Sequence, residues 1–470
     1  MFSGTMTRVQ PLPLAVAGVA LIALAIFWAV PAQKRITPRL PGADGRPESA
    51  AGGGSGGNPV LRGSVIAGFA KPADLGGTWT RFRGDQISAE ATYAGTIART
   101  WGETGPRKLW SLDVGEGYAG AAIWRGRAFV MDYDREKKHE ALRCVSLTDG
   151  QEIWRYSFPN QVKRDHGVTR TVPAVVSNLV VAIGPKCHVL AVDAETGALK
   201  WSIDMVKEFG ATIPPWYTGQ CPLVDGDKVI LAPSGPDTLM CAVELTTGKV
   251  IWRTPNPRGW KMTHSSVMPI EFNGQRMFVY CGSGGVVGAS AKDGKILWDT
   301  IDWKISLATV PCPIDLGGGR LFLTGGYNAG SLFLQLKQDG ERVTPEIVTR
   351  LKAEVFGATQ HAPILHRDHL FGVRADGRFA CLTREGKVAW TSEPGSNLGL
   401  GSFIIVNDVI LALNDSGTLH LIEANPAAYK SLAKAKVLDG PEAWGPMAFA
   451  DGRLIVRDLN KMVCLDIAAH

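Results

Sequence analysis

Apolar and polar positions along the chain repeat a short hairpin pattern. In LAVDAETGALKW, Leu190 to Trp201, an apolar run leads into a polar turn, and a second run ends on tryptophan. Glycine supplies the positive φ that a tight turn needs, so the stretch predicts two antiparallel strands. Near-copies of this hairpin end at Trp154, Trp252, Trp298 and Trp390.

The copies are spaced like the units of a repeat protein. From Trp110 to Trp298 the successive tryptophans lie 44, 47, 51 and 46 residues apart, and 92 residues separate Trp298 from Trp390. The double interval predicts a copy without a tryptophan at 334–348, and a copy with a longer turn follows at 419–438. Periods of this length indicate one supersecondary unit repeated along the chain.

Each period has room for four strands, and the ends of the chain fix the number of units. One period holds a first hairpin around Asp225-Gly226 and a second around Thr247-Gly248. The last copy, 445–467, holds only three strands, whereas an unmatched fourth strand lies at 107–115. We therefore predict an all-β fold, an eight-bladed β-propeller of four-stranded antiparallel blades whose last blade is closed by an N-terminal strand.

The repeated tryptophans are predicted to pack between neighbouring blades, because a large ring buries much apolar area there. This blade-docking set is Trp110, Trp154, Trp201, Trp252, Trp298 and Trp390.

The residues before the repeat divide by composition. Residues 1–10 form a short N-terminal segment, and the uncharged apolar run at 11–31 is long enough to cross a bilayer as a helix. Residues 32–60 are rich in proline, glycine and serine, which is typical of a flexible linker. Residues 61–106 are expected to be a lead-in segment that packs on the propeller of residues 107–470.

The apolar run has two interpretations. A cleaved signal peptide would end near the small residues at 30–32, but the length of the run and Trp28 favour a retained anchor. Three basic residues follow the run closely and only Arg8 precedes it, which by the positive-inside tendency opposes export of the propeller.

Charge and cysteine usage narrow the function classes. The net charge of +6 is mild, and no basic run with interleaved aromatic residues is present, so nucleic acid is not an expected partner. The eight cysteines include no adjacent pair and no CxxC spacing, so we interpret them as small core residues. We predict no metal site and a monomeric propeller.

The repeat resembles a known family. The pattern AxDxxTGxxxW, carried by Ala191 to Trp201, resembles the PQQ-like β-propeller repeat, and WTRFRG at 79–84 is similar to the opening of a membrane-tethered bacterial branch. The family includes quinoprotein dehydrogenases and the propeller lipoprotein of the outer-membrane barrel-assembly machinery. The resemblance covers 79–467 and implies a propeller in the cell envelope, on the periplasmic side of the inner membrane. The vicinal cysteines expected of the quinoprotein enzymes are absent, so no catalytic residue is carried over.

The two faces of the predicted ring differ. The turns within hairpins are short, whereas the connections between blades are long; we call the face that carries them the long-loop face. Ligands collect on such loops around the axis of a rigid β scaffold. The candidate binding residues on these connections are Tyr118, His166, Arg170, Trp216, Tyr217, Trp260, Lys261, His264, Trp303, Lys304, His361 and Trp444.

Five of the candidates, Tyr118, Arg170, His264, His361 and Trp444, fall at the start of a predicted innermost strand. We therefore expect their side chains to converge at the mouth of the channel. Arg170, Lys261 and Lys304 would make this mouth cationic, which suits a carboxylate or an acidic peptide. Packing of the aromatic residues on neighbouring loops is the structural alternative.

The sequence thus favours a non-catalytic, membrane-tethered propeller that binds a protein or another envelope ligand on the long-loop face, with no cofactor. The alternative is a quinoprotein oxidoreductase that acts on an alcohol or sugar with PQQ and Ca²⁺ in the channel, where the protein would only position the cofactor.

Overall fold

A computed structural model describes residues 57–469. The predicted segments 1–10 and 11–31, and nearly all of 32–60, lie outside the described residues. Within 57–469 no helix has both the length and the apolar character needed to cross a membrane.

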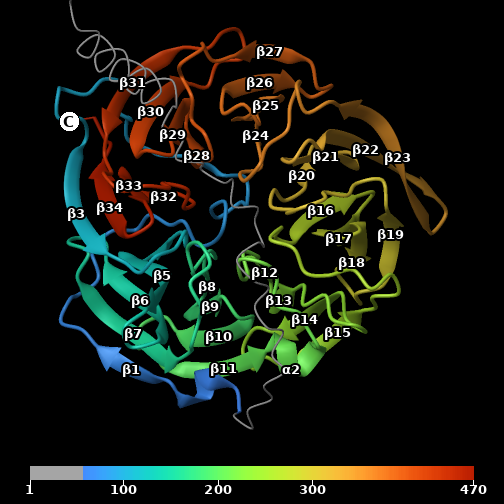
Figure 1. The fold of residues 1–470 in the computed structure, drawn as a ribbon, viewed down its shortest axis with the longest axis horizontal. Coiled ribbons are helices and arrows are strands. Elements are labelled where there is room, and N and C mark those ends of the chain that lie inside the picture. Colours follow the sequence, from blue (N-terminus) through green and yellow to red (C-terminus); the bar gives the residue numbers. More distant parts are fainter. Residues whose placement is uncertain (1–56, 470) are drawn as a thin grey trace, which may run out of the picture. The chain divides into compact units, whose positions relative to one another are not determined.

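Eight small antiparallel sheets stand around a common centre (Figure 1), which confirms the predicted eight-bladed propeller. From inner to outer strand, blade one is β4 (Ala122–Trp124), β5 (Arg127–Asp134), β6 (His139–Ser146) and β7 (Glu152–Pro159); blade two is β8 (Ala174–Val176), β9 (Leu179–Ile183), β10 (His188–Asp193) and β11 (Leu199–Asp204); blade three is β12 (Leu223–Asp225), β13 (Lys228–Leu231), β14 (Met240–Glu244) and β15 (Val250–Thr254); blade four is β16 (Met268–Phe272), β17 (Gln275–Gly282), β18 (Gly285–Ser290) and β19 (Ile296–Thr300).

The next three blades repeat the plan, and short elements decorate the ring. Blade five is β20 (Ile314–Asp315), β21 (Arg320–Gly325), β22 (Gly330–Asp339) and β23 (Arg342–Leu351); blade six is β24 (Ile364–His366), β25 (His369–Val373), β26 (Phe379–Thr383) and β27 (Val388–Thr391); blade seven is β28 (Phe403–Val406), β29 (Val409–Leu413), β30 (Thr418–Glu423) and β31 (Ser431–Lys436). The additional elements are the 3-10 turn η1 (Pro59–Arg62), β1 (Ser64–Ala67) on the outer edge of β7, β2 (Glu90–Ala91) beside β28, and the helix α2 (Met205–Phe209).

Blade eight joins the two ends of the repeat, as predicted. It contains β32 (Ala448–Ala450), β33 (Arg453–Arg457) and β34 (Lys461–Asp466), and β3 (Arg107–Asp113) pairs antiparallel with β34 as its outer strand. The ion pair from Lys461 Nζ to Asp113 Oδ1, 3.5 Å, ties the two strands together at one end. Closure in this way leaves no gap in the ring for another chain to pair with.

The tryptophan of one blade rests on a turn glycine of the next. The indole of Trp154 lies so close to Gly197 that a Cβ there would sit 2.7 Å from the ring, and its Nε1 donates to the Ala194 carbonyl at 3.3 Å. Gly197 has φ of 73°, which also favours glycine. The same contact recurs between Trp110 and Gly150, Trp201 and Gly248, and Trp252 and Gly294.

The remaining two tryptophans of the set make different contacts. Trp390 donates to the carbonyl of Asn425 in blade seven at 2.8 Å, whereas Trp298 bonds Met277 Sδ within its own blade and packs among the core leucines of blade five. The TG step and the tryptophan of the sequence motif are therefore two halves of one contact between blades.

Blade five lacks the tryptophan, as the spacing predicted, and its aromatic ring comes from another strand. Ile347 and Val348, at the expected position, are 43% and 46% exposed. The turn glycine of blade six, Gly386, instead faces Phe333 of β22, where an added Cβ would lie 2.7 Å from the ring. An aromatic ring thus still covers the glycine.

The lead-in segment enters the centre of the ring from the short-turn face. Trp79, 2% exposed, pairs with Ile123 of β4, and the carbonyl of Thr80 accepts from Val175 of β8 at 2.7 Å. Arg81 donates to the carbonyl of Val224 in β12 at 2.7 Å. Further along, β2 runs parallel to β28. The segment therefore bonds the innermost strands of four blades.

Arg83 anchors the deepest part of this segment. Its guanidinium donates to the carbonyls of Ile87 and Ser88 and, at 3.0 Å each, to those of Ala362 and Pro363 in blade six. Burial lowers the pKa of Arg83, and four carbonyl oxygens replace the water that the charge has lost. The WTRFRG stretch thus fills the channel from its short-turn end to the start of β24, next to His361.

Substitution at the turn glycines tests the docking contact. Gly226 and Gly248 both have positive φ, but a Cβ meets nothing within 4 Å at Gly226 and lies 2.7 Å from the Trp201 ring at Gly248. We expect Gly226→Ala to cost about 1 kcal/mol of unfolding free energy from backbone strain. Gly248→Ala should cost roughly 1–3 kcal/mol more from displacement of Trp201. Equal losses for the two variants in urea denaturation would contradict the contact.

Candidate functional site

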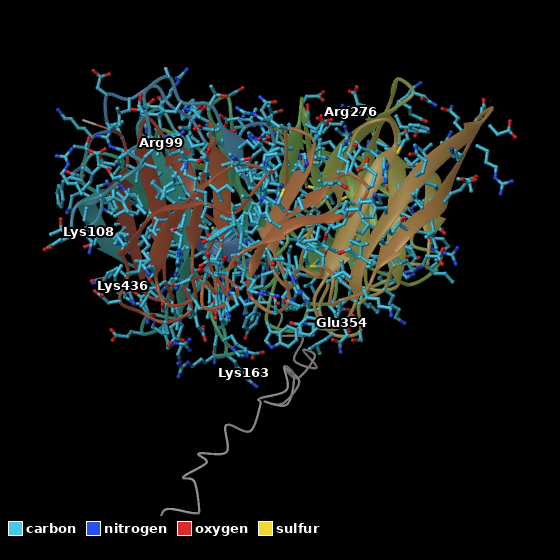
Figure 2. All side chains as sticks on the ribbon, turned by 90° about the horizontal axis from the view of Figure 1, so that it is seen from above. Arg99, Lys108, Lys163, Arg276, Glu354 and Lys436 are labelled. Carbon is cyan, nitrogen blue, oxygen red and sulfur yellow. The ribbon has the colours of Figure 1, made fainter. Side chains whose placement is uncertain are left out.

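The short turns and the long connections between blades lie on opposite faces of the propeller (Figure 2). Arg276, beside a short β16–β17 turn, lies at one face, whereas Lys163 and Glu354, in connections between blades, lie at the other. The lead-in occupies the channel on the side of the short turns. The long-loop face therefore holds the end of the channel where side chains could meet a ligand.

Six predicted residues contact one another in a chain at this end of the channel. Each precedes an innermost strand, and we call them the mouth cluster: Tyr118, Arg170, Trp216, His264, His361 and Trp444. Trp444 stacks on Tyr118 with ring centroids 5.3 Å apart, and the Arg170 guanidinium lies 4.9 Å from the centre of the Tyr118 ring. The convergence expected from the repeat is thus what the fold produces.

The chain of contacts continues in both directions. Nε of Arg170 donates to the carbonyl of Trp216 at 2.5 Å, and the Trp216 and His264 rings are 6.1 Å apart. On the other side Nε2 of His361, before blade six, lies 3.2 Å from the carbonyl of Trp444, before blade eight. The cluster therefore draws together loops from blades one, two, three, four, six and eight.

The tyrosine and the two histidines of the mouth cluster are held neutral. Burial raises the pKa of Tyr118, and its hydroxyl donates to Glu442 Oε2 at 2.5 Å, which raises it further. Burial lowers the pKa of His264 to about 3, with Arg170 adding to the effect, and lowers that of His361 to about 4. Near neutral pH the cluster therefore carries the Arg170 cation among uncharged rings.

The other six candidates do not join the mouth cluster. Tyr217 is buried, and its hydroxyl donates to the carbonyl of Lys163 at 2.8 Å. Trp260 packs against Gly284 and Gly285, and Trp303 lies in the shared core of blades four and five. These three aromatic residues have the structural role that was the alternative interpretation.

His166, Lys261 and Lys304 are exposed on the long-loop face. His166 belongs to the loop that carries Arg170, whereas the backbone of Lys261 bonds Ser283 at the β17–β18 turn, away from the inner strands. Of the three expected cations, Arg170 is the one that the described contacts bring into the cluster. The mouth is therefore less cationic than the sequence suggested.

The sequence reasoning missed two residues that shape the mouth. Glu442, two positions before Trp444, binds the Tyr118 hydroxyl, and a carboxylate in PEAWGP gave no signal for this contact. Arg457, 1% exposed, supports the same region by donating to the carbonyls of Gly115 and Ala119 from β33. An arginine at the end of a core strand is a signal that could have been noticed.

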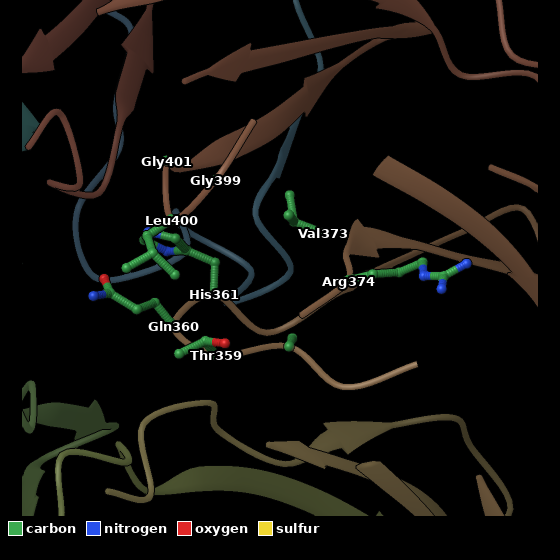
Figure 3. Close-up of a pocket in the computed structure, with 9 residues that line it drawn as sticks. Thr359, Gln360, His361, Val373, Arg374, Gly399, Leu400 and Gly401 are labelled. Atoms are coloured by element: carbon green, nitrogen blue, oxygen red, sulfur yellow. The ribbon is translucent and has the colours of Figure 1, made fainter. Parts of the chain in front are cut away.

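A hollow adjoins the mouth between blades six and seven. A small pocket of about 10 Å³, room for about one water molecule, is lined by His361, Thr359 and Leu400 among others (Figure 3). A larger groove of about 410 Å³ shares Leu400 and is lined mainly by polar side chains and glycines, including Asp376 and Asp415. Because Asp415 accepts the indole N–H of Trp444 at 2.7 Å, the groove reaches the mouth cluster.

The residues present do not fit PQQ with Ca²⁺ in the channel. The WTRFRG stretch fills the channel as far as Ala362 and Pro363, at the start of β24, and the Arg170 guanidinium lies over the Tyr118 ring. Within 57–469 no three His, Cys, Asp or Glu side chains come close enough together to hold a metal ion. We therefore derive no redox step.

A buried carboxyl group lies behind the loop of Arg170. Glu140 on β6 is fully buried, accepts from Asn160 Nδ2 at 2.7 Å, and has a second oxygen without a partner. Burial raises the pKa of Glu140 to about 8. The group is therefore protonated near neutral pH, which lowers the cost of keeping it buried.

Comparisons with known proteins agree with the fold. A family model described as outer membrane protein assembly factor BamB matches residues 138–392. The crystal structure of BamB from Moraxella catarrhalis is 14% identical, with a TM-score of 0.53 over 77% of this chain and 99% of that one. The crystal structure of the computationally designed Ika8 protein is 12% identical, with a TM-score of 0.52 over 76% of this chain and 99% of that one. A europium-containing methanol dehydrogenase is 11% identical, with a TM-score of 0.45 over 81% of this chain and 89% of that one. No curated protein matches the sequence.

Glu140 makes stability depend on pH. Its pKa is about 8 in the folded protein and 4.5 in the unfolded chain, so the folded state binds the extra proton between these values. Stability from this group is complete below pH 4.5 and is lost as pH rises to 8, by an amount on the order of a few kcal/mol.

Glu140→Gln removes this titration. Denaturant unfolding at several pH values measures the difference in unfolding free energy between the variant and the wild type. This difference should increase in favour of the variant between pH 4.5 and 8, and it should be constant below pH 4.5 and constant again above pH 8. The exposed Glu136→Gln serves as the control and should follow the wild type throughout. A constant difference between Glu140→Gln and wild type across the window would show that Glu140 ionises normally.

Proposed function

Because the chain belongs to the family described as outer membrane protein assembly factor BamB, we propose that it is a non-catalytic scaffold that holds a protein partner on its long-loop face. The mouth cluster carries this proposal. It gathers tryptophan, tyrosine and arginine at the centre of one face, and these residue types dominate the binding energy of protein interfaces.

Because the lead-in segment fills part of the channel, the long-loop face is a more suitable binding surface than the channel interior. A partner that docks on the long-loop face would meet the mouth cluster at the middle of its contact area and the groove between blades six and seven at one side. The propeller itself would act as a rigid, monomeric platform, since its blades are packed around a closed ring.

We further propose that residues 11–31 anchor the chain in the inner membrane and that 32–60 tether the propeller on the periplasmic side. The motivation is the apolar run and the composition of the linker. A tether of this kind would leave the long-loop face free to turn toward a partner in the cell envelope.

Site-directed photo-crosslinking in intact spheroplasts tests the face. The full chain carries benzoylphenylalanine in place of Lys261 on the long-loop face or, as a matched control, of Lys292 in the opposite turn of the same blade. We expect one discrete protein adduct from position 261 and none from 292. Trp444→Ala should weaken that adduct because loss of a central tryptophan costs about 2 kcal/mol, roughly thirty-fold in affinity.

Two outcomes would contradict the proposal. An adduct that forms from 292 and not from 261 would place the partner on the short-turn face. Survival of the propeller when the same spheroplasts are treated with protease, with digestion only after lysis, would place it on the cytoplasmic side.

A further inference from the structure

From the geometry around Arg170 we infer that the mouth cluster contains a subsite for a single carboxylate next to an apolar or aromatic group. This inference rests on the proposed function, because it names the chemistry by which a partner would be recognised. It concerns Arg170 and the rings of Tyr118, Trp216 and Trp444.

Arg170 has an incomplete set of partners. Nε donates to the Trp216 carbonyl, one face of the guanidinium lies over the Tyr118 ring, and Nη2 is buried without a hydrogen-bond partner in the described part of the chain. No carboxylate within 57–469 forms an ion pair with it. Arg170 as a whole is half-buried, but a buried donor such as its Nη2 is costly to leave unpaired unless an anion or water completes its shell.

The other buried arginines of the channel show the contrast. The guanidinium of Arg83 donates hydrogen bonds to four carbonyls. The guanidinium of Arg457 also donates to four carbonyls, those of Gly115, Ala119, Asp458 and Leu459. Both are satisfied by the fold itself. Arg170 therefore differs from them in keeping donors for something outside the fold.

The nearby carboxylates do not fill this role. Asp165 and Glu442 are close enough to favour the charged form of Arg170, but neither bonds it. Glu442 is occupied by the Tyr118 hydroxyl. The negative charge of these two carboxylates opposes a further anion, so a ligand carboxylate would have to hydrogen-bond the Arg170 guanidinium directly, in a short, charge-assisted contact.

Aromatic rings flank the cation, and two of them, Tyr118 and Trp216, are buried. Trp444 is stacked on Tyr118, and Trp216 lies against His264 on the other side of Arg170. Trp216 and Tyr217 hold consecutive left-handed conformations, φ 59° and 70°, a strained arrangement that positions the Trp216 carbonyl and ring. A ligand with a ring or aliphatic chain beside its carboxylate would match both features.

The two histidines carry no charge, so the selection of a charged ligand depends on Arg170. His264 and His361 are half-buried and neutral, so they add no positive charge that would attract phosphate or polyanions. One cation between aromatic rings suits a monovalent carboxylate. Two sources carry that chemistry, the C-terminus of a peptide chain and an acidic side chain.

The test uses the full chain in detergent micelles and titration calorimetry with small probes. N-acetylphenylalanine presents a terminal carboxylate, N-acetylphenylalaninamide is its uncharged match, and N-acetyl-glutamyl-phenylalaninamide has only a side-chain carboxylate. At least one acid should bind saturably and about tenfold or more tighter than the uncharged amide, which is the effect of one charge-assisted hydrogen bond. The stronger of the two acids identifies the source.

Variants assign the effect to Arg170. Arg170→Gln should weaken the acid about tenfold or more and leave the amide unchanged, while Arg170→Lys should keep part of the preference as a point charge. Lys163→Gln, exposed on the same loop, should bind like the wild type. If Arg170→Gln fails to fold, the acid–amide comparison on the wild type still decides.

Equal binding of acid and amide, no binding of either acid, or unchanged binding by a folded Arg170→Gln would overturn the subsite. These results are separable from the proposed function. A partner crosslinked from position 261 together with equal probe affinities would retain the scaffold and reject the carboxylate subsite. Selective acid binding without a crosslinked partner would retain the carboxylate subsite and reject the scaffold.

Discussion

The structure depends on the requirement that every blade be covered by its neighbours. A four-stranded sheet of this size exposes two apolar faces, and neither is buried until the next blade is in place. The tryptophan-to-glycine contacts supply much of that burial, at Trp154 on Gly197 and at three equivalent places. Such an arrangement is complete only when the last blade meets the first, and β3 beside β34 provides that closure.

Closure of the ring also builds the site. The innermost strands all begin on one face, so residues just before them are brought to the axis although they lie far apart in the chain. Tyr118 and Trp444 are 326 positions apart in sequence, and their rings stack. The lead-in enters from the opposite end, with Trp79 on β4, and reaches Ala362 beside His361 with Arg83, which leaves one mouth available. A one-sided platform is the shape expected of a binding module.

Much of this could be predicted from the sequence because the repeat places residues by their position in a period. The tryptophan spacing predicted eight blades, and the start of the inner strand predicted that Tyr118, Arg170 and His264 converge. Side chains whose contacts depend on packing between loops could not be predicted. Trp260 and Trp303 share the composition of a binding loop, yet Trp260 packs on Gly284 and Gly285 and Trp303 lies in the core shared by blades four and five.

Other features lay outside what periodicity can show. Phe333 replaces the missing tryptophan from a different strand, because only the packed structure reveals which ring covers Gly386. The role of Arg83 depends on carbonyls of Ala362 and Pro363, 279 and 280 positions away. A local motif such as WTRFRG indicates a family, but it does not say which distant backbone groups need a donor.

The closure of the ring can be measured on the unaltered chain with a zero-length carbodiimide crosslinker, which converts contacting lysine–carboxylate pairs into amides. The account predicts a peptide in which Lys461 is joined to Asp113 in the native protein and lost in urea, alongside the pair Lys430–Glu423 within blade seven as an internal standard. Recovery of the Lys430–Glu423 product without the Lys461–Asp113 product, or attachment of Lys461 to another blade, would contradict the closed ring and the mouth that it assembles.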